Sequence, residues 1–419
     1  MTDASRGAAF DALRAVQERD AFVNLLLPAL LRERRLDARA AALATELAHG
    51  TLRWQGTYDA LIDHLTPGRT IEPAVRDVLR LGCHQILSMR IPDHAAVSTS
   101  VDLVKSEVGH RATGFTNAIL RRVAAHPLDH WLAELTTGLT VDAALSVRTS
   151  HPEWIVAALR DALGPDGDLS ALLAADNVPP KVTLVARPGL CEPDELPGEP
   201  GRLSPYARIL DGGDPSEIPA VSEGRAGVQD EGSQVVALRL AEAELEGPDG
   251  RWLDLCAGPG GKAALLGALA AQRGATLIAN DVQPHRADLV AAVTANLPNI
   301  TVSSEDGRSG PWSSGTFDRV LVDAPCTGLG ALRRRPEARW RRTPADLADL
   351  VPLQIALLGR AVELVRPGGL VMYSTCSPHL AETREVVASV GVEPESVVQL
   401  WPHIDGTDAM YSALIRKPS

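Results

Sequence analysis

The feature that most constrains the fold is an alternation of apolar, strand-like runs with helical stretches, which begins near residue 226. Helix-like segments such as "GKAALLGALAAQ" and "RADLVAAVTANL" separate the runs. The runs are "RWLDLC", "ATLIANDV", "ITVSS", "FDRVLVDAP" and "GGLVMYSTC". Such alternation indicates βαβ units and a mostly parallel sheet. Helices should then cover both faces of the sheet. We therefore expect an α/β domain over residues 226–419.

The first 140 residues predict a different architecture, a small helical bundle. The stretch "AVRDVLRLGCHQILSM" has apolar residues at a helical period, and "STSVDLVKSEV" and "GFTNAILRRVAAH" behave likewise. Short breakers such as "TPGRT" and "IPDH" separate these segments. The expected buried face of the first stretch consists of Val75, Val78, Leu79, Cys83, Ile86 and Leu87.

The region 141–225 is expected to be a linker or a small α+β subdomain. "KVTLVARP" is typical of a strand, whereas "EPDELPGEPGRLSP" is rich in proline, glycine and acid and indicates a loop. A chain of 419 residues is also too long for one ordinary core, so several domains are expected.

The distribution of charge leaves room for a nucleic-acid partner although the net charge is −12. Residues 1–140 carry 16 basic and 16 acidic residues, and the rest carries 25 basic against 37 acidic. Within that acidic part, "LRRRPEARWRR" (332–342) holds six arginines and one glutamate. A local basic patch can bind phosphates in an acidic protein. The alternative is an ordinary solvated loop in which Trp340 anchors the core.

Several other classes of protein are not favoured. No run reaches the ~18 apolar residues of a membrane span, and the N-terminus lacks the pattern of an export signal. Five cysteines, an odd number, are expected to be reduced thiols in the cytoplasm. They show no zinc-ligand spacing, so no metal is expected.

The candidate ligand residues follow the predicted strands, where open α/β sheets bind their ligands. The turn "DLCAGPGGK" (254–262) lets the backbone approach a ligand and begins a helix. It is neither a G-x-G-x-x-G fingerprint nor a Walker A loop. Asp281 ends the next strand and could accept hydrogen bonds from a ribose, or cap the following helix. Asp306 could lie at an adenine edge or be a turn aspartate in "EDGR". A nucleoside cofactor such as S-adenosylmethionine or NAD is favoured.

Two of the five cysteines follow predicted strands on the ligand side. Cys326 lies in "VDAPCTG" and Cys376 in "YSTCS". A buried cysteine is usually a small hydrophobe, which we expect of Cys83 and Cys191. A thiol near backbone N–H groups at a strand end can instead be a nucleophile.

Together, "DLCAGPGGK", "DAPCTG" and "YSTCS" resemble the RNA cytosine-C5 methyltransferases of the NOL1/NOP2/Sun (Fmu) class. The resemblance covers roughly 226–419, including "GVQDEGSQ". Residues 1–140 resemble a NusB-like helical domain, particularly "IPDHAAVSTSVDLVK" and "GFTNAILRRV". This pairing is similar to bacterial enzymes that methylate 16S rRNA. It implies a Rossmann-like sheet that binds S-adenosylmethionine, and an enzyme that acts on RNA. We expect a monomer that needs no metal and does not bind a membrane.

The resemblance also implies roles for individual residues. Cys376 is implied as the nucleophile, Cys326 as an aid to product release, and Asp323 as a residue between cofactor and cytosine. The implied cofactor residues are Cys256, Ala257, Gly258, Pro259, Gly260, Gly261, Lys262, Asp281, Arg286, Asp306 and Asp323. The family often has Glu-Asn-Glu after its second cysteine motif, whereas this chain keeps Glu382 but has Thr383. A role for Glu382 is therefore open.

Such chemistry needs one cysteine to add to the base and one to help it leave. Thiolate addition at C6 makes C5 of cytosine nucleophilic toward the methyl group, and a stabilised charge at N3, for which Asp323 is the candidate, supports this. The target base must be unpaired or flipped out. The alternatives are a tRNA substrate, a nicotinamide-linked dehydrogenase, or a non-catalytic NusB-like RNA-binding factor. The candidate phosphate ligands are Arg333, Arg334, Arg335 and Arg339.

Overall fold

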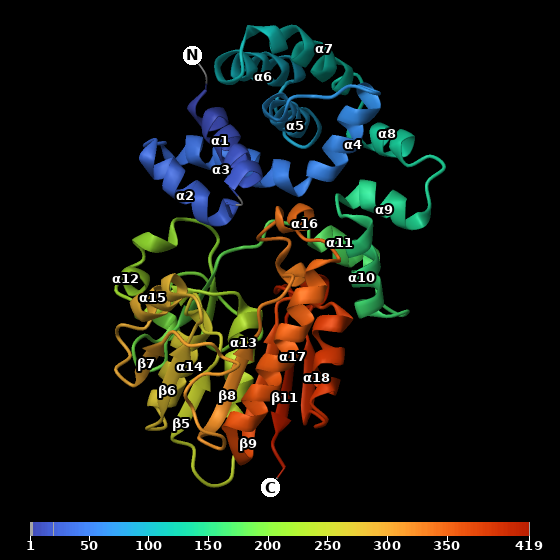
Figure 1. Cartoon of the computed structure of the whole chain (residues 1–419). Helices are drawn as coiled ribbons and strands as arrows, with labels where there is room; N and C mark the ends of the chain where they lie inside the picture. Colours follow the sequence, from blue (N-terminus) through green and yellow to red (C-terminus); the bar gives the residue numbers. More distant parts are fainter. Residues whose placement is uncertain (1–2, 20, 419) are drawn as a thin grey trace. The chain divides into compact units, whose positions relative to one another are not determined.

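The computed structural model describes residues 3–19 and 21–418 and contains two compact units (Figure 1). The first, here called the helical unit, comprises Met1–Arg160, Gly167–Val178 and Leu332–Arg341. The second, the α/β unit, comprises Asp161–Asp166, Pro179–Ala331 and Arg342–Ser419. The predicted boundary at residue 140 thus falls inside the helical unit. That unit also takes in ten residues from the C-terminal half of the chain, which no local pattern indicates.

The helical unit is built as the apolar periodicity predicts. Of the expected buried face, Val75, Val78, Leu79 and Cys83 are buried, and Ile86 and Leu87 pack partly buried against the same core. The helices are α1 (Ala4–Arg19), α2 (Val23–Glu33), α3 (Ala38–Arg53), α4 (Gln55–Leu65), α5 (Pro73–Leu87), α6 (Asp93–Glu107), η1 (His110–Ala112), α7 (Thr113–Val123), α8 (Leu128–Leu135), α9 (Val141–Thr149), α10 (Glu153–Leu163), α11 (Leu169–Ala175) and α16 (Ala338–Arg341).

The α/β unit contains a seven-stranded sheet in the order β10-β11-β9-β8-β5-β6-β7. Strands β9, β8, β5, β6 and β7 are parallel, and β10 and β11 join antiparallel at one edge. The strands are β5 (Arg251–Asp254), β6 (Thr276–Asn280), β7 (Ile300–Ser303), β8 (Phe317–Asp323), β9 (Val365–Thr375), β10 (Ser396–Gln399) and β11 (Tyr411–Arg416). All five strands predicted from the alternation are present, and the two antiparallel strands were not predicted.

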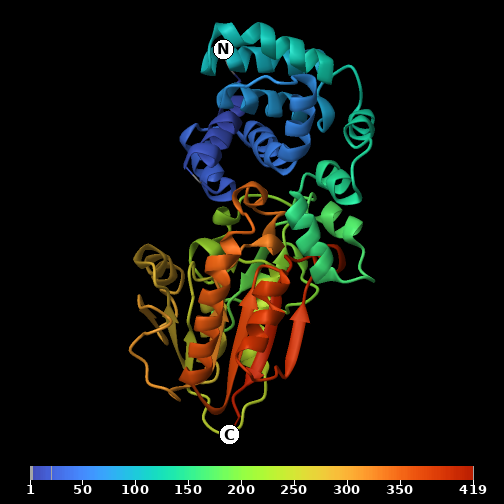
Figure 2. The same ribbon diagram turned by 45° about the vertical axis from the view of Figure 1, so that its right-hand side comes forward.

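Side chains of each central strand alternate between two apolar cores, one on each face of the sheet. In β8, Leu321 packs into one core and Val320 and Val322 into the other. Helices α13, α14 and α15 contribute to the first core, and α17 and α18 to the second (Figures 1 and 2). The bounds are α13 (Glu231–Glu242), α14 (Gly261–Ala271), α15 (Pro284–Val293), α17 (Asp346–Leu364), η5 (Leu380–Glu382), α18 (Arg384–Ser389), α19 (Pro402–Asp405) and η4 (Leu329–Ala331). The prediction of helices on both faces is confirmed.

A second, four-stranded antiparallel sheet of order β2-β3-β1-β4 precedes the large one. The predicted strand "KVTLVARP" is β1, and the proline-rich stretch after it is mostly loop. The remaining elements are β1 (Thr183–Ala186), η2 (Pro193–Glu195), β2 (Glu199–Pro200), β3 (Ala207–Ile209), η3 (Pro215–Glu217), α12 (Pro219–Ser222) and β4 (Ala226–Val228).

The topology of the large sheet fixes where a site can form. Strands β5 to β9 are parallel, so the residues that follow their carboxyl ends share one edge of the sheet. In register, Asp323 of β8 lies opposite Ser374 of β9. Every strand end that the sequence singled out therefore belongs to this edge.

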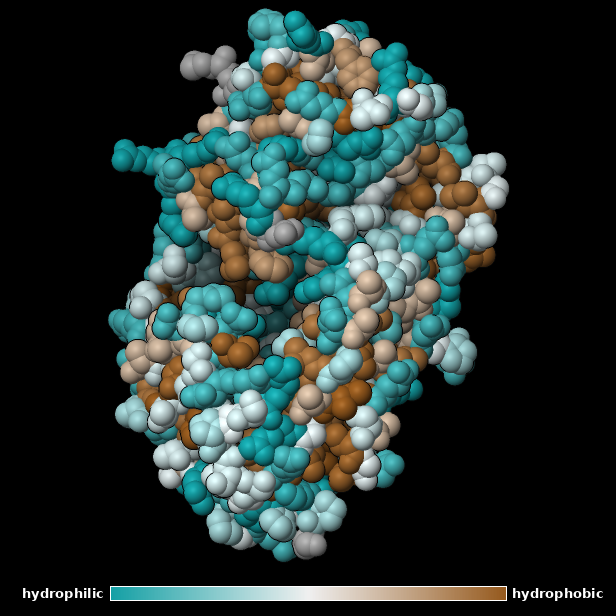
Figure 3. Space-filling model, viewed as in Figure 1, coloured by the Kyte–Doolittle hydropathy of each residue, from teal (hydrophilic) through white to brown (hydrophobic). Residues whose placement is uncertain are grey.

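Within the residues that the structure describes, no helix combines the length and the apolar character that crossing a membrane requires. On the face shown in Figure 3, hydrophobic and hydrophilic side chains are intermixed. Exposed large apolar side chains occur at scattered positions such as Leu25, Val141 and Ile404, which is ordinary for a folded protein.

Candidate active site

The glycine turn connects β5 to α14 and brings backbone groups to the carboxyl edge of the sheet. Gly260, the residue before α14, has a φ of +110°, which favours glycine. A Cβ on Gly258 would lie 2.4 Å from Asp281 Oδ2 and 2.7 Å from Arg286 Nε. Only glycine fits at 258 without displacing these two side chains. The turn "CAGPGG" is thus shaped by close packing against the residues that follow β6.

Asp281 and Arg286 brace this turn. Gly258 N donates to Asp281 Oδ2 at 3.0 Å, and Arg286 donates to the carbonyl of Gly258. The guanidinium of Arg286 also lies 3.4 Å from Asp281 Oδ2. Asp281 Oδ1 also accepts from the backbone N–H of Gln283 at 3.0 Å, but Gln283 and not Asp281 is the N-cap residue of α15, so Asp281 does not cap this helix. Asp281 and Arg286 therefore both contact the glycine turn, and their contact with a cofactor stays a prediction.

Asp306 lies in the turn after β7 and pairs locally. Its Oδ1 accepts from Arg308 N at 2.9 Å, and its Oδ2 accepts from Arg308 Nη2 at 2.6 Å. These hydrogen bonds to Arg308 lower the pKa of Asp306 to about 2. The turn-aspartate alternative raised by "EDGR" thus describes the contacts of this residue, and a contact with adenine stays a prediction.

Asp323 ends β8 and has two partners at the sheet edge. Lys262 Nζ lies 2.8 Å from Asp323 Oδ2, and Ser374 Oγ donates to Oδ1 at 3.0 Å. Burial lowers the pKa of Lys262, but the charge of Asp323, with a smaller contribution from Cys376, raises it above its ordinary value. Lys262, one of only four lysines in the chain, is therefore a half-buried cation that pairs with Asp323 and interacts electrostatically with Cys376.

The two cysteines singled out from the sequence face each other. Cys326 Sγ lies 3.3 Å from Cys376 Sγ, and both side chains are half-buried. The hydrogen bond with Cys376, followed by burial and by the charges of Cys376, Glu382 and Asp323, raises the pKa of Cys326 well above its usual range. The hydrogen bond and the burial therefore both favour the protonated form of Cys326. Cys83 and Cys191 are buried in apolar cores, as predicted, and burial raises the pKa of Cys256.

Gly330 locks the loop after Cys326 onto the loop of Cys376. Its N–H donates to the carbonyl of Cys376 and its carbonyl accepts from Ala409 N, each at 2.8 Å. A Cβ at this position would lie 2.1 Å from the carbonyl oxygen of Ala409. The sequence analysis missed Gly330, because only the partner loop reveals the close approach.

Two further buried polar side chains lie at the cofactor turn without partners. Neither carboxylate oxygen of Asp254 and neither amide atom of Gln229 has a hydrogen-bond partner. Asp254 is 0% exposed at the end of β5, and Gln229 lies 3.9 Å from where Gly261 would carry a Cβ. Buried polar groups without partners beside a glycine turn fit a polar ligand such as S-adenosylmethionine, a nucleoside joined through sulfur to an amino acid. Asp254 is the first residue of the motif "DLCAGPGGK", but the sequence analysis assigned it no role.

Not all arginines of the basic segment 332–342 are exposed to solvent. This corrects the prediction that Arg339 is a phosphate ligand. Arg339 is 0% exposed and donates to the carbonyls of Arg53 (2.9 Å), Ser150 (3.1 Å) and Asp176 (2.9 Å), and to Asn177 Oδ1 (2.8 Å). A guanidinium with these partners holds the helical unit together and is not available to an RNA phosphate.

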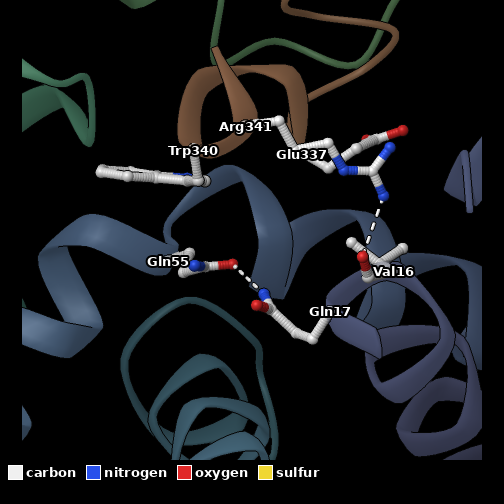
Figure 4. Close-up of a pocket in the computed structure, with 6 residues that line it drawn as sticks. All are labelled: Val16, Gln17, Gln55, Glu337, Trp340 and Arg341. Atoms are coloured by element: carbon white, nitrogen blue, oxygen red, sulfur yellow. Dashed lines mark hydrogen bonds between the residues drawn. The ribbon is translucent and has the colours of Figure 1, made fainter. Parts of the chain in front are cut away.

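The neighbours of Arg339 are placed differently from one another. Arg333 is also buried, Arg334 is half-buried and Arg335 is exposed. The guanidinium of Arg335 lies 5.2 Å from the ring centre of Phe22. Arg341 donates to the carbonyls of Val16 and Ala21. Figure 4 shows this segment over α1 and α4, where a cavity of about 250 Å³ is lined by Val16, Gln17, Gln55, Glu337, Trp340 and Arg341.

Comparison with known proteins identifies the family. Residues 240–393 match the family model described as 16S rRNA methyltransferase RsmB/F, and residues 3–125 match the NusB family. The methyltransferase B of the ribosomal small subunit from Pseudomonas putida is 33% identical over 401 residues, covering 91% of this chain and 87% of that protein. The chain belongs to the RsmB/F family of methyltransferases. A Mycobacterium tuberculosis relative, Rv1407, is 48% identical over 446 residues, with coverage of 99% and 97%, and its name specifies a methyltransferase without a substrate.

Membership of the RsmB/F family makes the chain an S-adenosylmethionine-dependent RNA methyltransferase that forms 5-methylcytosine. The predicted cofactor is confirmed, and the dehydrogenase alternative is removed. The fold agrees, because the crystal structure of PH0851 superimposes with a TM-score of 0.82 over 100% of this chain and 99% of that one, at 21% identity. Among the described residues, no group of three His, Cys, Asp or Glu side chains is arranged to hold a metal ion.

Proposed function

We propose that this RsmB/F protein methylates C5 of a cytosine in 16S rRNA through a covalent bond between Cys376 Sγ and C6 of the base. The observation that carries the proposal is the thiol pair: two sulfur atoms 3.3 Å apart at the ends of adjacent parallel strands. Lys262, the second residue of α14, interacts electrostatically with Cys376. S-adenosylmethionine, when bound at Cys256–Gly261, Asp281 and Arg286, would supply the methyl group.

Cys376 is the nucleophile in this proposal because of the proton of Cys326. A thiolate is needed to attack C6, and an S–H donor or a cation nearby favours the thiolate form. Cys326 keeps its proton and is placed to donate it toward Cys376 Sγ, while Lys262 adds a positive charge. Addition of the thiolate to C6 breaks the ring conjugation and turns C5 into an enamine-like carbon that accepts the methyl group.

Asp323 and Lys262 would stabilise the negative charge that develops at N3 of the cytosine. Both oxygens of Asp323 accept hydrogen bonds, from Lys262 and Ser374. A carboxylate alone has no proton to donate, but the ammonium of Lys262 donates a hydrogen bond to it at 2.8 Å. Asp323 would therefore pass or share the Lys262 proton with N3, which stabilises the adduct electrostatically.

Cys326 would act in the last step, when the C5 proton is lost and Cys376 leaves C6. The hydrogen bond to Cys376 is the largest cause of its raised pKa. Once Cys376 Sγ is bonded to carbon, that interaction changes, because a thioether is a much weaker acceptor than a thiolate. Cys326 would then be able to accept the C5 proton or to position the cytosine ring for elimination of Cys376.

The 16S substrate is supported by the name of the P. putida relative and of the matching family model. The target cytosine must be unpaired or flipped out to reach Cys376. Exposed Arg335 and half-buried Arg334 are the phosphate ligands that we retain from the basic segment. We place the reaction in the cytoplasm, carried out by a monomer, with the NusB-family domain adding RNA contacts.

The experiment compares wild type, Cys326→Ala and Cys376→Ala with S-adenosylmethionine and protein-free 16S rRNA, and with bulk tRNA in parallel. We expect an adduct that survives a denaturing gel for Cys326→Ala alone, on 16S rRNA. An adduct formed only by Cys376→Ala would reverse the two roles. Methyl transfer confined to tRNA would replace the substrate. No adduct with any variant and no methyl transfer to either RNA would refute the proposal.

A further inference from the structure

A buried glutamate lies behind the cysteine pair and has no part in the mechanism so far. Glu382 ends the short η5 helix after β9 and is 0% exposed. In the sequence it follows Cys376 by six positions. A fully buried carboxylate is costly unless hydrogen bonds satisfy its oxygens, so its partners indicate what it is for.

Two partners of the Glu382 carboxylate are the residues that directly follow the two cysteines. Thr327, next to Cys326, donates its backbone N–H to Oε1 at 2.7 Å and its hydroxyl to Oε2. Ser377, next to Cys376, donates its hydroxyl to Oε2 at 2.6 Å. One carboxylate therefore bonds to both cysteine loops, although they are 50 residues apart in the sequence.

The bonds leave little freedom in how the two loops meet. A carboxylate only accepts hydrogen bonds, and each hydroxyl has a single proton to donate. Both hydroxyl protons are directed at Oε2, which holds Thr327 Oγ1 and Ser377 Oγ 3.0 Å apart. Each of these residues is joined by one peptide bond to a cysteine, so their spacing bears directly on the spacing of the thiols.

Neighbouring residues fix Glu382 itself. Gln354 Nε2, from α17, donates to Glu382 Oε1 at 3.1 Å and to the carbonyl of Pro325 at 2.8 Å. Tyr373 donates its hydroxyl proton to the backbone carbonyl of Glu382 at 2.7 Å. Pro325 directly precedes Cys326, so this network holds the Cys326 loop on both sides of the thiol.

We propose that Glu382 is a positioning residue that sets the distance between the two thiols. The proposal rests on the proposed function for its catalytic consequence, but the effect on thiol geometry stands independently. Without the carboxylate, Thr327 and Ser377 lose their common acceptor, and the cysteine loops can separate. The thiol pair, which must add to and leave the same base, would then be assembled only part of the time.

The test measures how readily the two thiols meet, as the rate of disulfide formation, in protein without RNA or cofactor. Diamide, an azo oxidant, takes up two electrons and two protons from a pair of neighbouring thiols and leaves a disulfide. We would follow the Cys326–Cys376 disulfide by peptide mass spectrometry in wild type, Glu382→Ala and Glu382→Gln. Cys326→Ser cannot form this disulfide and gives the background signal of the assay.

The matched control is Glu231→Ala, in the same unit. Glu231 is also a buried glutamate that accepts backbone N–H groups, those of Leu203 and Ser204, with no bond to a cysteine loop. It reports what loss of a buried carboxylate does in general. Circular dichroism and binding of S-adenosylhomocysteine by calorimetry identify variants that have lost their fold.

We expect Glu382→Ala to lower the rate of disulfide formation at least tenfold, with cofactor affinity changed less than threefold and Glu231→Ala close to wild type. The turnover rate of methyl transfer should fall about 100-fold, which is the cost of misplacing reacting groups by about 1 Å. Glu382→Gln, which keeps one acceptor oxygen, should lie between the two. It replaces Glu382→Ala if that variant does not fold.

Disulfide formation at the wild-type rate in the folded Glu382 variants would overturn the proposal, whatever their activity. An equal slowing in Glu231→Ala would also overturn it, because the effect would then be general loosening. Slower disulfide formation in a protein whose wild type methylates neither RNA would uphold the role of Glu382 and remove only the proposed function.

Discussion

Replacing Arg339 with alanine tests whether the basic segment is a structural anchor. Arg339 makes four hydrogen bonds inside the helical unit at 2.8–3.1 Å. A hydrogen bond from a charged donor contributes about 1.5–3 kcal/mol. Four of them therefore offer roughly 6–12 kcal/mol before the cost of burying the charge is considered.

That cost follows from the shifted pKa. Burial lowers the pKa of Arg339 from 12.5 to about 9, which corresponds to about 5 kcal/mol against the buried charge. The difference is roughly 1–7 kcal/mol, and its middle value gives an expected net loss of about 4 kcal/mol for Arg339→Ala. For a unit of this size, such a loss lowers the melting temperature by about 10 °C.

The assay is thermal and urea unfolding of the full-length protein, followed by circular dichroism and tryptophan fluorescence. Arg335→Ala is the matched control, because the guanidinium of this exposed neighbour lies over the Phe22 ring, so its loss should cost under about 1 kcal/mol. If Arg339→Ala unfolds within 1 kcal/mol of wild type but binds RNA more weakly, with a reduced dependence on salt, the anchor interpretation is wrong and Arg339 binds phosphate.

Three further substitutions test the site. Gly258→Ala should weaken binding of S-adenosylhomocysteine at least tenfold by calorimetry, because the new Cβ would lie 2.4 Å from Asp281 Oδ2; unchanged affinity would contradict the packing argument. Burial, aided by the charge of Asp323, raises the pKa of Asp254 from 3.8 to about 8. The folded state then binds more protons than the unfolded state between these values, so this group makes the free energy of unfolding fall by about 1.4 kcal/mol per pH unit from pH 4 to 8. Asp254→Asn should remove that slope in urea titrations of the cofactor-free protein at pH 5.5 and 7.5, and an unchanged slope would show that Asp254 is not its source. Lys262→Met should lower methyl transfer about 100-fold with cofactor affinity within threefold, because Asp323 loses its proton-sharing partner; a loss confined to cofactor affinity would assign Lys262 to the cofactor instead.

The sequence predicted the central sheet because each strand carries its own evidence. The runs that became β5 to β9 are apolar, short and separated by helical segments, which is a local pattern. Strands β10 and β11 were missed because only the four-residue helix α19 and turn residues lie between them, so no long helical segment marks the alternation there. Their place at the sheet edge is set by the pairing of β11 with β9 and of β10 with β11, and no local sequence pattern shows which strands pair.

The basic segment shows the same limit at the level of single side chains. Arg335 and Arg339 are chemically identical in the sequence, yet one is exposed and the other is fully buried. What separates them is the position of carbonyl groups on Arg53, Ser150 and Asp176, more than 160 residues away in each case. Charge counting could not have assigned one to solvent and the other to the core.

The cysteine pair is the clearest case of a site whose identity is local but whose geometry is not. The motifs around Cys326 and Cys376 were sufficient to choose these two thiols among five. Their separation of 3.3 Å, however, depends on polar residues that look like ordinary loop formers. Thr327 and Ser377 acquire meaning only because Glu382 accepts hydrogen bonds from both. A substitution at Glu382 should therefore disturb the chemistry of two cysteines that it does not touch, which is why the disulfide assay is more informative than activity alone.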